Sequence, residues 1–317
     1  MTSPSTSLRL AGGVILAAVV VAAITTPAGT TAPNLAGQAN LSELWQDPGD
    51  IAARDLRWGR GGQALAPSAD VEYAFKAIDA VGYSAGYDVV DPEGRPWDVK
   101  TGDEGQPEVI ASRLLWAVGY HQPVVYYLPE WRLTNGPVPR PLPGRFRLES
   151  DHAALGDWSW NENPFKGTRE LRGLVLANLL INNWDLKSSN NKFLMVPMPA
   201  GTERWFVVQD LGASFGKTAW PIGTRNRLED FESQRFVLGV QDGRVQFDYH
   251  ARHRELLEDL APADVLWILG LFNRITDQQW NDVFSAAAMS ADTSSRYIRK
   301  MKAKIQEGLA LSGQGTS

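Results

Sequence analysis

Five polar residues occur along the chain in an order that suits the handling of a polyphosphate and a divalent metal ion. They are Lys100, Glu108, Asp185, Asn190 and Asp210. A phosphoryl donor carries several negative charges, so its transfer depends on cations and bound metal rather than on covalent chemistry by the protein. A strand lysine can hold the donor phosphates, a helix glutamate can hold that lysine, and an acid can orient the attacking hydroxyl. An asparagine and an aspartate offer the hard oxygen ligands that Mg²⁺ prefers.

The segment NNWDLKSSNNKFL, residues 182–194, crowds polar residues directly behind an apolar helix. One interpretation is a helix-ending turn, because Asn, Asp and Ser favour turns through local hydrogen bonds. The other is a catalytic set formed by Asp185, Lys187 and Asn190. Taken alone, Lys100 is typical of a solvated lysine near a strand end, and Glu108 of a carboxylate favoured by a helix dipole. Their shared order favours the catalytic interpretation.

The first half of the chain predicts a small, mainly antiparallel sheet with one helix. Strands are predicted at YAFKAID (73–79), YDVVD (87–91) and PWDVK (96–100), and further strands at PVVYYLP (123–129) and RFRLES (145–150). DPEG, residues 91–94, predicts a hairpin between the second and third strands. The helix is expected to begin near Pro107 and to end at Gly119.

The second half predicts mainly helices. TRELRGLVLANLLINN, residues 168–183, has apolar residues at helical spacing and ends at two asparagines. Two hairpins are expected, one around PAGTE (199–203) and one with Asp242–Gly243 as its turn. Helices follow from Ala261 onward, and TDQQ (276–279) is a capping box. The basic run at 294–305 is typical of the solvated face of an amphipathic helix. The predicted fold class is therefore α+β, a β-lobe followed by an α-lobe.

The motifs DLKSSN and VVQDLG together resemble the protein-kinase-like superfamily. Its catalytic loop has the form D-L-K-x-x-N, and its metal-binding aspartate lies in D-[FL]-G. The chain is most similar to the atypical branch of HipA-type, phosphoinositide-kinase-like and secreted Golgi kinases. The resemblance covers roughly residues 70–230 and implies a two-lobed fold that uses ATP, or another nucleoside triphosphate, together with Mg²⁺.

The resemblance also implies roles for individual residues. Asp185 resembles the catalytic aspartate, and Lys187 resembles the lysine that steadies the transferred phosphoryl group. Asn190 and Asp210 resemble the metal ligands.

Lys100 resembles the strand lysine that holds the donor phosphates, and Glu108 its helix partner. Because Glu108 follows Lys100 by only eight positions, Glu104 stands as the alternative partner. The loop AVGYSAG, residues 80–86, occupies the place of the phosphate-covering loop, where backbone amides and the Ser84 hydroxyl would face the phosphates. Its candidate nucleotide-binding residues are Gly82, Ser84 and Gly86.

Two features depart from the pattern of ordinary protein kinases. Trp184 stands where an arginine usually precedes the catalytic aspartate, and Asn183 where a histidine does. Control through a phosphorylated activation loop is therefore not expected. No A-P-E signature follows DLG, so the peptide-docking part of ordinary protein kinases is not predicted.

The N-terminus predicts export. A single arginine, Arg9, precedes fifteen uncharged residues, AGGVILAAVVVAAIT (11–25), and small residues follow with Ala28 or Ala32 at a cleavage site. We interpret residues 1–32 as a signal peptide or an N-terminal anchor, with residues 10–25 as a membrane tether in the second case. Residues 33–70 are predicted to be a linker or surface arm, 71–150 the β-lobe and 151–317 the α-lobe. Export places the protein in the periplasm, outside the cell or on the outer face of the cytoplasmic membrane.

Composition narrows the function further. The formal net charge of −5 argues against nucleic acid as a general partner, and the absence of cysteine excludes disulfides and thiolate metal sites. Twelve tryptophans favour core packing over a sugar-stacking surface. The predicted function is an exported phosphotransferase whose acceptor is a hydroxyl of a saccharide, lipid or protein. The alternatives are a catalytically inactive binding module with the same fold, and transfer of a nucleotide (AMPylation) instead of a phosphoryl group.

Overall fold

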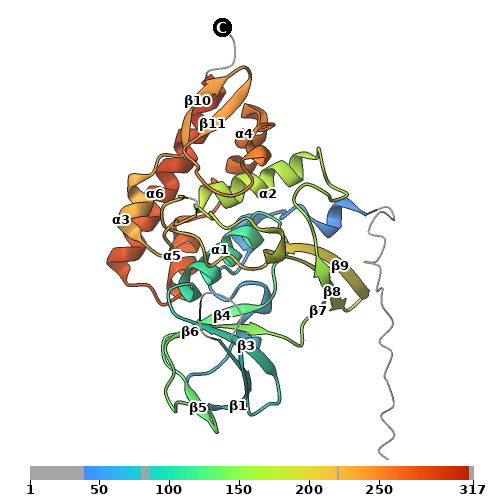
Figure 1. The fold of residues 1–317 in the computed structure, drawn as a ribbon, viewed down its shortest axis with the longest axis vertical. Coiled ribbons are helices and arrows are strands. Elements are labelled where there is room, and N and C mark those ends of the chain that lie inside the picture. Colours follow the sequence, from blue (N-terminus) through green and yellow to red (C-terminus); the bar gives the residue numbers. More distant parts are fainter. Residues whose placement is uncertain (1–38, 80–83, 85, 220, 314–317) are drawn as a thin grey trace, which may run out of the picture. The chain divides into compact units, whose positions relative to one another are not determined.

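The computed structural model describes residues 39–79, 84, 86–219 and 221–313 (Figure 1). The predicted signal peptide or anchor of residues 1–32, the predicted tether of residues 10–25 and the loop residue Gly82 lie outside the described residues. The predicted fold class is confirmed, because a mainly antiparallel β-part with one helix precedes a mainly helical part. The domain boundaries at residues 70 and 150 stay predictions.

A six-stranded sheet with the order β4-β6-β3-β2-β1-β5 forms the β-part. All its pairs are antiparallel except β1 with β5, which run parallel. The predicted hairpin between β2 and β3 is confirmed, whereas β5 was not predicted because three residues are too few for an alternation to show. The strands are β1 (Glu72–Asp79), β2 (Gly86–Val90), β3 (Pro96–Thr101), β4 (Val125–Leu128), β5 (Arg132–Thr134) and β6 (Gly144–Leu148).

One face of this sheet is apolar. Trp97 and Val99 of β3 and Phe146 and Leu148 of β6 alternate onto it, as a strand period of two residues requires. Aromatic rings meet there edge to face, for example Trp97 and Phe146 with centroids 6.0 Å apart. Such pairs add about 0.5–1.5 kcal/mol beyond the burial of their area. The opposite face is therefore left to the charged residues of the same strands.

Helix α1 (Gly105–Ala117) links the sheet to the helical part. It begins only four residues after the end of β3 and contacts β4 and β6 on one side and α5 on the other. Val109, Ile110 and Leu114 are fully buried in the main core. Gly119 follows with a positive φ of 99°, which confirms the predicted end of the helix.

A second sheet of three strands follows the β-part in sequence, with helix α2 (Arg169–Leu180) between its first strand and its other two. The predicted hairpin of β8 (Asn191–Met198) and β9 (Gly201–Val208) is confirmed. Strand β7 (Ala153–Asp157) pairs with β8 and was not predicted. Its sequence AALGD has no β-branched or aromatic residue and is exposed throughout, so it carries no strand signal.

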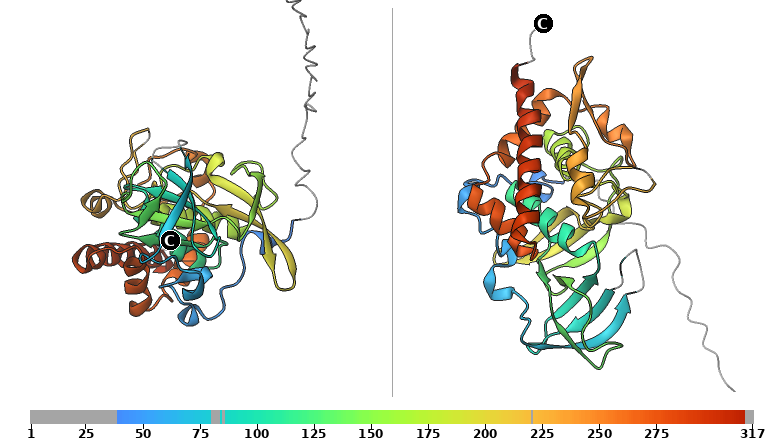
Figure 2. Two further views of the ribbon diagram at one scale, coloured as in Figure 1. Left: turned by 90° about the horizontal axis from the view of Figure 1, so that it is seen from below. Right: turned by 90° about the vertical axis from the view of Figure 1, so that its left-hand side faces the viewer.

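The remaining elements confirm the predicted hairpin and helices. The turn Asp242–Gly243 joins β10 to β11 with both residues at positive φ, as a two-residue hairpin turn of type I′ requires. Thr276 and Gln279 form the predicted capping box. Figure 2 shows α6 as the long helix beside α4 and α5, which it contacts. The elements are α2 (Arg169–Leu180), α3 (Leu228–Ser233), β10 (Val237–Gln241), β11 (Arg244–Phe247), α4 (Pro262–Phe272), α5 (Asp277–Ala286) and α6 (Ala291–Leu309).

The segment before the sheet, residues 41–65, packs into the core. Its short 3₁₀ turns present Leu44, Ile51 and Leu56, all fully buried, to the main core. Trp158, Trp160 and Trp280 are almost fully buried in the same core, and Trp97 is almost fully buried on the apolar face of the six-stranded sheet, which confirms packing as the main role of these tryptophans. Within the described ranges no helix has the length and apolar character that a membrane span requires.

Lys304 corrects the prediction for the basic run at 294–305. It was expected on a solvated helix face, but its side chain is 1% exposed. Its ammonium donates to the carbonyl oxygen of Leu180 at 3.1 Å and to Oδ1 of Asn182 at 2.6 Å, and it lies 4.3 Å from the ring centre of Phe231. Burial lowers the pKa of Lys304 well below its ordinary value, and the charge of Lys300 adds to this effect.

The pH dependence of stability should report this burial. A lysine whose folded pKa lies below its unfolded value contributes stability that is complete above the unfolded pKa, about 10.4. That contribution is lost as the pH falls through the folded pKa. We therefore expect the difference in unfolding free energy between wild type and Lys304→Met to move in favour of wild type from about pH 7 to about pH 10. Urea unfolding of both proteins checks this, and a difference that is constant with pH would contradict it.

Candidate active site

The pairing register of β3 with β6 places charged side chains on one face of the sheet. Asp98 pairs with Arg147 and Lys100 with Arg145, so four charged side chains share one face. Arg145 lies 3.3 Å from Asp98 and is 1% exposed. Helix α1 covers this face and reduces the access of water to the charges. Their electrostatic interactions are therefore stronger than in bulk water.

Lys100 lies at the centre of an acidic cluster. Its Nζ is 3.0 Å from Oδ1 of Asp210, 3.4 Å from Glu108 and 3.7 Å from Glu104. The two glutamates are four residues apart at the start of α1 and therefore share one helix face. Both candidate partners of Lys100 thus contact it, and Glu108 is the closer. The structure brings Lys100 and Glu108 together with Asp210, which lies 110 positions after Lys100 in sequence.

The protonation states of Lys100 and Asp210 depend on each other. Burial disfavours the ammonium of Lys100, but the charges of Glu108 and Asp210 outweigh it and hold its pKa above the ordinary value. Burial likewise disfavours the carboxylate of Asp210, but the charge and hydrogen bond of Lys100 outweigh it, so the pKa of Asp210 is lowered. Both groups are therefore charged at neutral pH.

Buried asparagines hold the loop that carries Asp185 in place through hydrogen bonds. Asn183 is fully buried and donates to Oδ1 of Asn178 at 2.9 Å, and Tyr249 donates its hydroxyl to the carbonyl of Asn183. The Asp185 carboxylate is 17% exposed and lies 2.8 Å from Nζ of Lys187. The asparagines therefore end the helix, as the simpler interpretation proposed, and also hold Asp185 and Lys187 at the surface of the loop.

Backbone hydrogen bonds join this loop to the one that carries Asp210. The amide of Gln209 donates to the carbonyl of Asn190 at 2.9 Å, one residue before Asp210. The amide of Phe215 donates to Ile181 at 2.9 Å on the other side of the loop. The two candidate metal ligands, Asn190 and Asp210, are thereby placed at neighbouring positions of the hairpin base.

These two ligands fit Mg²⁺ by their chemistry. Among the described residues no three His, Cys, Asp or Glu side chains gather as a metal site. Mg²⁺, however, is usually bound through one or two carboxylates together with substrate phosphates and water. Asp210 supplies a carboxylate that is 38% exposed. The amide nitrogen of Asn190 is used by the carbonyl of Asp185 at 2.9 Å, which leaves its oxygen as the acceptor.

The predicted phosphate-covering loop is described only in part. Ser84 donates its hydroxyl to Oε2 of Glu104 at 2.9 Å, so in this structure it contacts the acidic cluster. Gly86 begins β2 directly opposite Lys100 in the register. A Cβ at Gly86 would lie 3.0 Å from Cβ of Asp79 and 3.2 Å from the carbonyl oxygen of Val99, so a larger residue would require these neighbours to shift. Of the candidate loop residues, Ser84 and Gly86 therefore lie beside the residues around Lys100.

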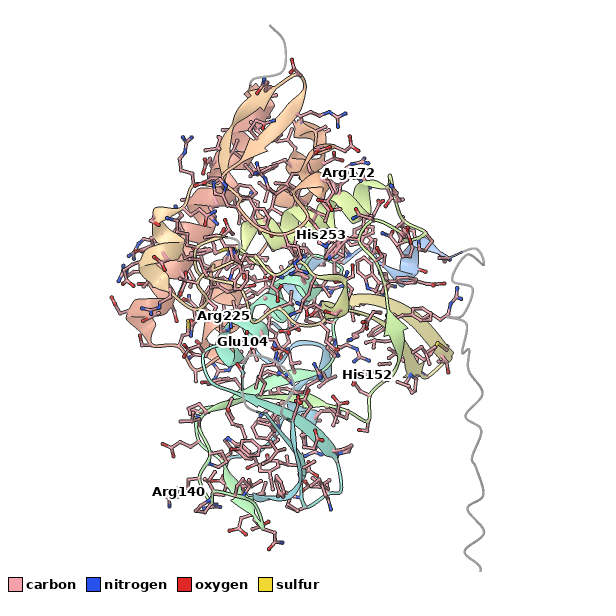
Figure 3. All side chains as sticks on the ribbon, viewed as in Figure 1. Glu104, Arg140, His152, Arg172, Arg225 and His253 are labelled. Carbon is pink, nitrogen blue, oxygen red and sulfur yellow. The ribbon has the colours of Figure 1, made fainter. Side chains whose placement is uncertain are left out.

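Trp184 holds the segment that follows the D-L-G motif. Its indole donates to the carbonyl of Thr224 at 3.0 Å, and the guanidinium of Arg225 lies 5.2 Å from its ring centre. Arg225 is also 3.0 Å from Glu104, and Figure 3 labels these two residues close together. The tryptophan that replaces the usual arginine therefore packs directly against this segment.

Arg145 and Arg225 are the charged residues of the cluster that sequence reasoning missed. For Arg145 a signal existed, because RFRL alternates arginine with apolar residues in the same way that PWDVK alternates Asp98 and Lys100. Nε of Arg145 lies 2.9 Å from Glu108, so the Glu108 carboxylate forms ion pairs with both Arg145 and Lys100. For Arg225 no signal existed, because it lies in an irregular loop whose path is set by tertiary contacts.

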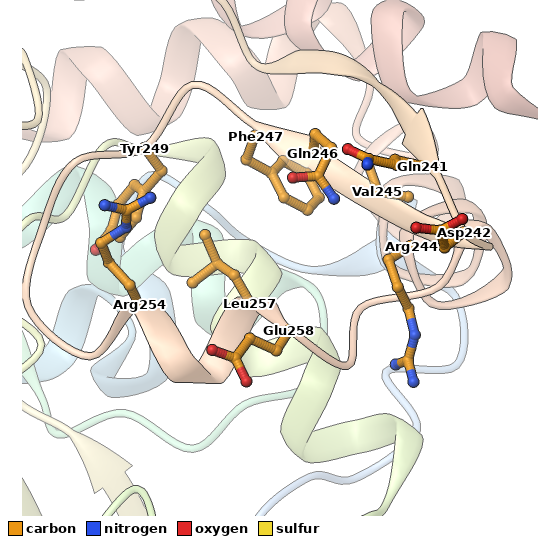
Figure 4. Close-up of a pocket in the computed structure, with 10 residues that line it drawn as sticks. All are labelled: Gln241, Asp242, Arg244, Val245, Gln246, Phe247, Tyr249, Arg254, Leu257 and Glu258. Atoms are coloured by element: carbon orange, nitrogen blue, oxygen red, sulfur yellow. The ribbon is translucent and has the colours of Figure 1, made fainter.

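A cavity of about 530 Å³ lies apart from the acidic cluster, between the β10–β11 hairpin and residues 254–258 (Figure 4). Phe247 and Leu257 form part of its wall, and Arg244 and Arg254 are charged residues at its edge. Lys100, Asp185 and Asp210 are not among the residues that line it. Tyr249 does line it and donates to Asn183, so one wall of this cavity touches the loop of Asp185.

Fold and site together place a strand lysine beside a helix glutamate and the aspartate of D-L-G, in the same part of the molecule as the D-L-K-x-x-N loop. A scan against protein-family models finds no match, and a search of curated proteins finds no relative. A search of solved structures finds the crystal structure of a Helicobacter pylori proinflammatory kinase, CtkA. It is 12% identical, has a TM-score of 0.48, and the match covers 78% of this chain and 99% of that chain. At this level the similarity assigns no activity to the chain.

Proposed function

We propose that the protein is a phosphotransferase that moves a phosphoryl group from a nucleoside triphosphate to a hydroxyl acceptor. The observation that carries this proposal is the contact of Lys100 with Glu108 and, across 110 positions of sequence, with Asp210. A solvated lysine or an ordinary turn aspartate has no reason to form this contact. Phosphoryl transfer needs positioning and charge neutralisation, which these groups supply.

In this mechanism Lys100 binds the donor phosphates and Glu108 holds the Lys100 ammonium in place. Asp210 and Asn190 would hold Mg²⁺, which when bound neutralises charge on the phosphates. Asp185 orients the acceptor hydroxyl and accepts its proton, and Lys187, 2.8 Å from Asp185, steadies the transferred group. Lys100 exchanges its contact with Asp210 for the phosphates, which frees the Asp210 carboxylate.

The cavity in Figure 4 is not lined by Asp185 and therefore does not by itself place an acceptor hydroxyl at that carboxylate, although its wall residue Tyr249 contacts the Asp185 loop. The acceptor is a hydroxyl of a saccharide, lipid or protein. The N-terminal pattern supports an exported protein, with the donor supplied outside the cytoplasm.

Thermal unfolding with and without ATP and Mg²⁺ tests the nucleotide and metal sites. A ligand at 100 times its Kd stabilises the folded state by about 2.7 kcal/mol, so the wild-type midpoint should rise clearly. In Asp210→Ala the part of this rise that depends on Mg²⁺ should be lost. No rise in wild type, or an equal rise in the variant, would remove the proposal. Mass spectrometry of incubated acceptors then distinguishes addition of phosphate from addition of a nucleotide.

A further inference from the structure

A separate cavity of about 290 Å³ lies beside α1, away from the acidic cluster. Glu108 and Arg113 are five positions apart on this helix, so their side chains leave it about 140° apart. Glu108 faces Lys100, whereas Arg113 lines the cavity. The walls come from the segment before the sheet, from β4 and from the end of α5. They include Trp58, Pro67, Tyr126, Tyr127, Leu128 and Ser285.

Arg113 is a buried cation without a carboxylate partner among the described residues. Its side chain is 2% exposed, and one terminal nitrogen donates to the carbonyl of Val125 at 2.7 Å. Its Nε is buried and has no hydrogen-bond partner in the described structure. Burial lowers the pKa of Arg113, against the opposing charges of Tyr126 and Asp55, to about 10. Since a buried charge is costly unless it is paired, this arrangement favours an anion at the cavity.

We propose that this cavity binds a small organic monocarboxylate with a flat apolar body. Arg113 offers one buried cation to a single negative charge, whereas the charge of Arg57, which also lines the cavity, is exposed and offset by water. A phosphate dianion would need more buried donors than Arg113 offers. Trp58, Tyr126 and Tyr127 are aromatic residues of the lining, which suits a flat apolar group. The cavity volume is close to the lower end of the range of known ligand pockets, so the ligand must be small. The site does not depend on the phosphotransferase function.

Calorimetry on the full chain tests the site with defined probes. The probes are indole-3-acetate, its uncharged counterpart indole-3-acetamide, and phenyl phosphate. We expect the carboxylate to bind at least about 10-fold more tightly than the amide, because a hydrogen bond to a charged group is the difference between them. Phenyl phosphate should bind more weakly than the carboxylate. Absence of binding by all three probes, equal affinity for acid and amide, or tighter binding of phenyl phosphate would each overturn the proposal.

Two variants locate the binding. Arg113→Met should remove the preference for the acid over the amide. Because that change can also impair folding, Ser285→Trp fills the cavity from an exposed position of α5 and should abolish binding while the thermal midpoint is retained. Ser233→Trp, the same substitution at an exposed position of α3, is the control and should bind like wild type. Undiminished binding by Ser285→Trp would overturn the assignment to this cavity.

Discussion

Asp185→Asn should lower kcat for phosphoryl transfer by about 10²–10⁴-fold, the range for removal of a general base. The substitution keeps the size of the side chain but can no longer accept the proton of the acceptor hydroxyl. The buried anchors of the loop, Asn183 and Tyr249, are untouched, so the fold and the affinity for the nucleotide should change little. Steady-state kinetics of phosphate transfer, with nucleotide affinity from calorimetry, measure the two effects separately.

Asp157→Asn provides the matched control for this prediction. Asp157 forms an ion pair with Lys192 at 2.6 Å and is 47% exposed, so it has a similar contact without a place in the site. Exposed ion pairs contribute little, about 0–1 kcal/mol, so its kcat should equal that of wild type. Wild-type turnover in Asp185→Asn would remove Asp185 from the mechanism, and an equal loss in both variants would point to a general electrostatic effect.

The sequence predicted the fold well where the signal is local. The hairpin at DPEG, the capping box at Thr276 and the end of α1 at Gly119 each depend on a few adjacent residues, and all three are confirmed. Strands β5 and β7 were missed because their residues carry no pattern of their own. Strand β7 forms by pairing with β8, and a tertiary interaction of this kind cannot be seen in a five-residue segment.

The candidate site was predicted through residue order, and its supporting charges were not. Lys100, Glu108 and Asp210 meet as their order in the sequence implied. Arg145 required knowledge of the register of β3 with β6, because only that register places it opposite Lys100. Lys304 was misplaced for a related reason. The basic composition of its helix suggested solvent, but the turn at Asn182 draws this one ammonium into the core.

Glu108→Gln should destabilise the protein by about 3–5 kcal/mol, the cost of breaking a buried ion pair by removing one partner. The Glu108 carboxylate is 1% exposed and lies 2.9 Å from Nε of Arg145 and 3.4 Å from Nζ of Lys100. The neutral amide leaves the buried cation of Arg145 with the Asp98 carboxylate, 3.3 Å away, in a site where little water can compensate the lost charge. Urea unfolding of the full chain measures this loss. Glu93→Gln, which weakens an exposed contact with Arg95, should cost at most about 1 kcal/mol.

The same variant decides which glutamate is the functional partner of Lys100. Glu104 lies farther from Lys100, at 3.7 Å, and is also bound by Arg225 and Ser84. If Glu108 positions Lys100, Glu108→Gln should weaken ATP binding more than Glu104→Gln does, at a temperature where both variants are folded. The reverse order would assign that role to Glu104. Adding Arg145→Met to Glu108→Gln should recover part of the lost stability, because it removes the cation that the first substitution leaves buried. A double variant less stable than Glu108→Gln would show that the cost arises from packing instead of charge.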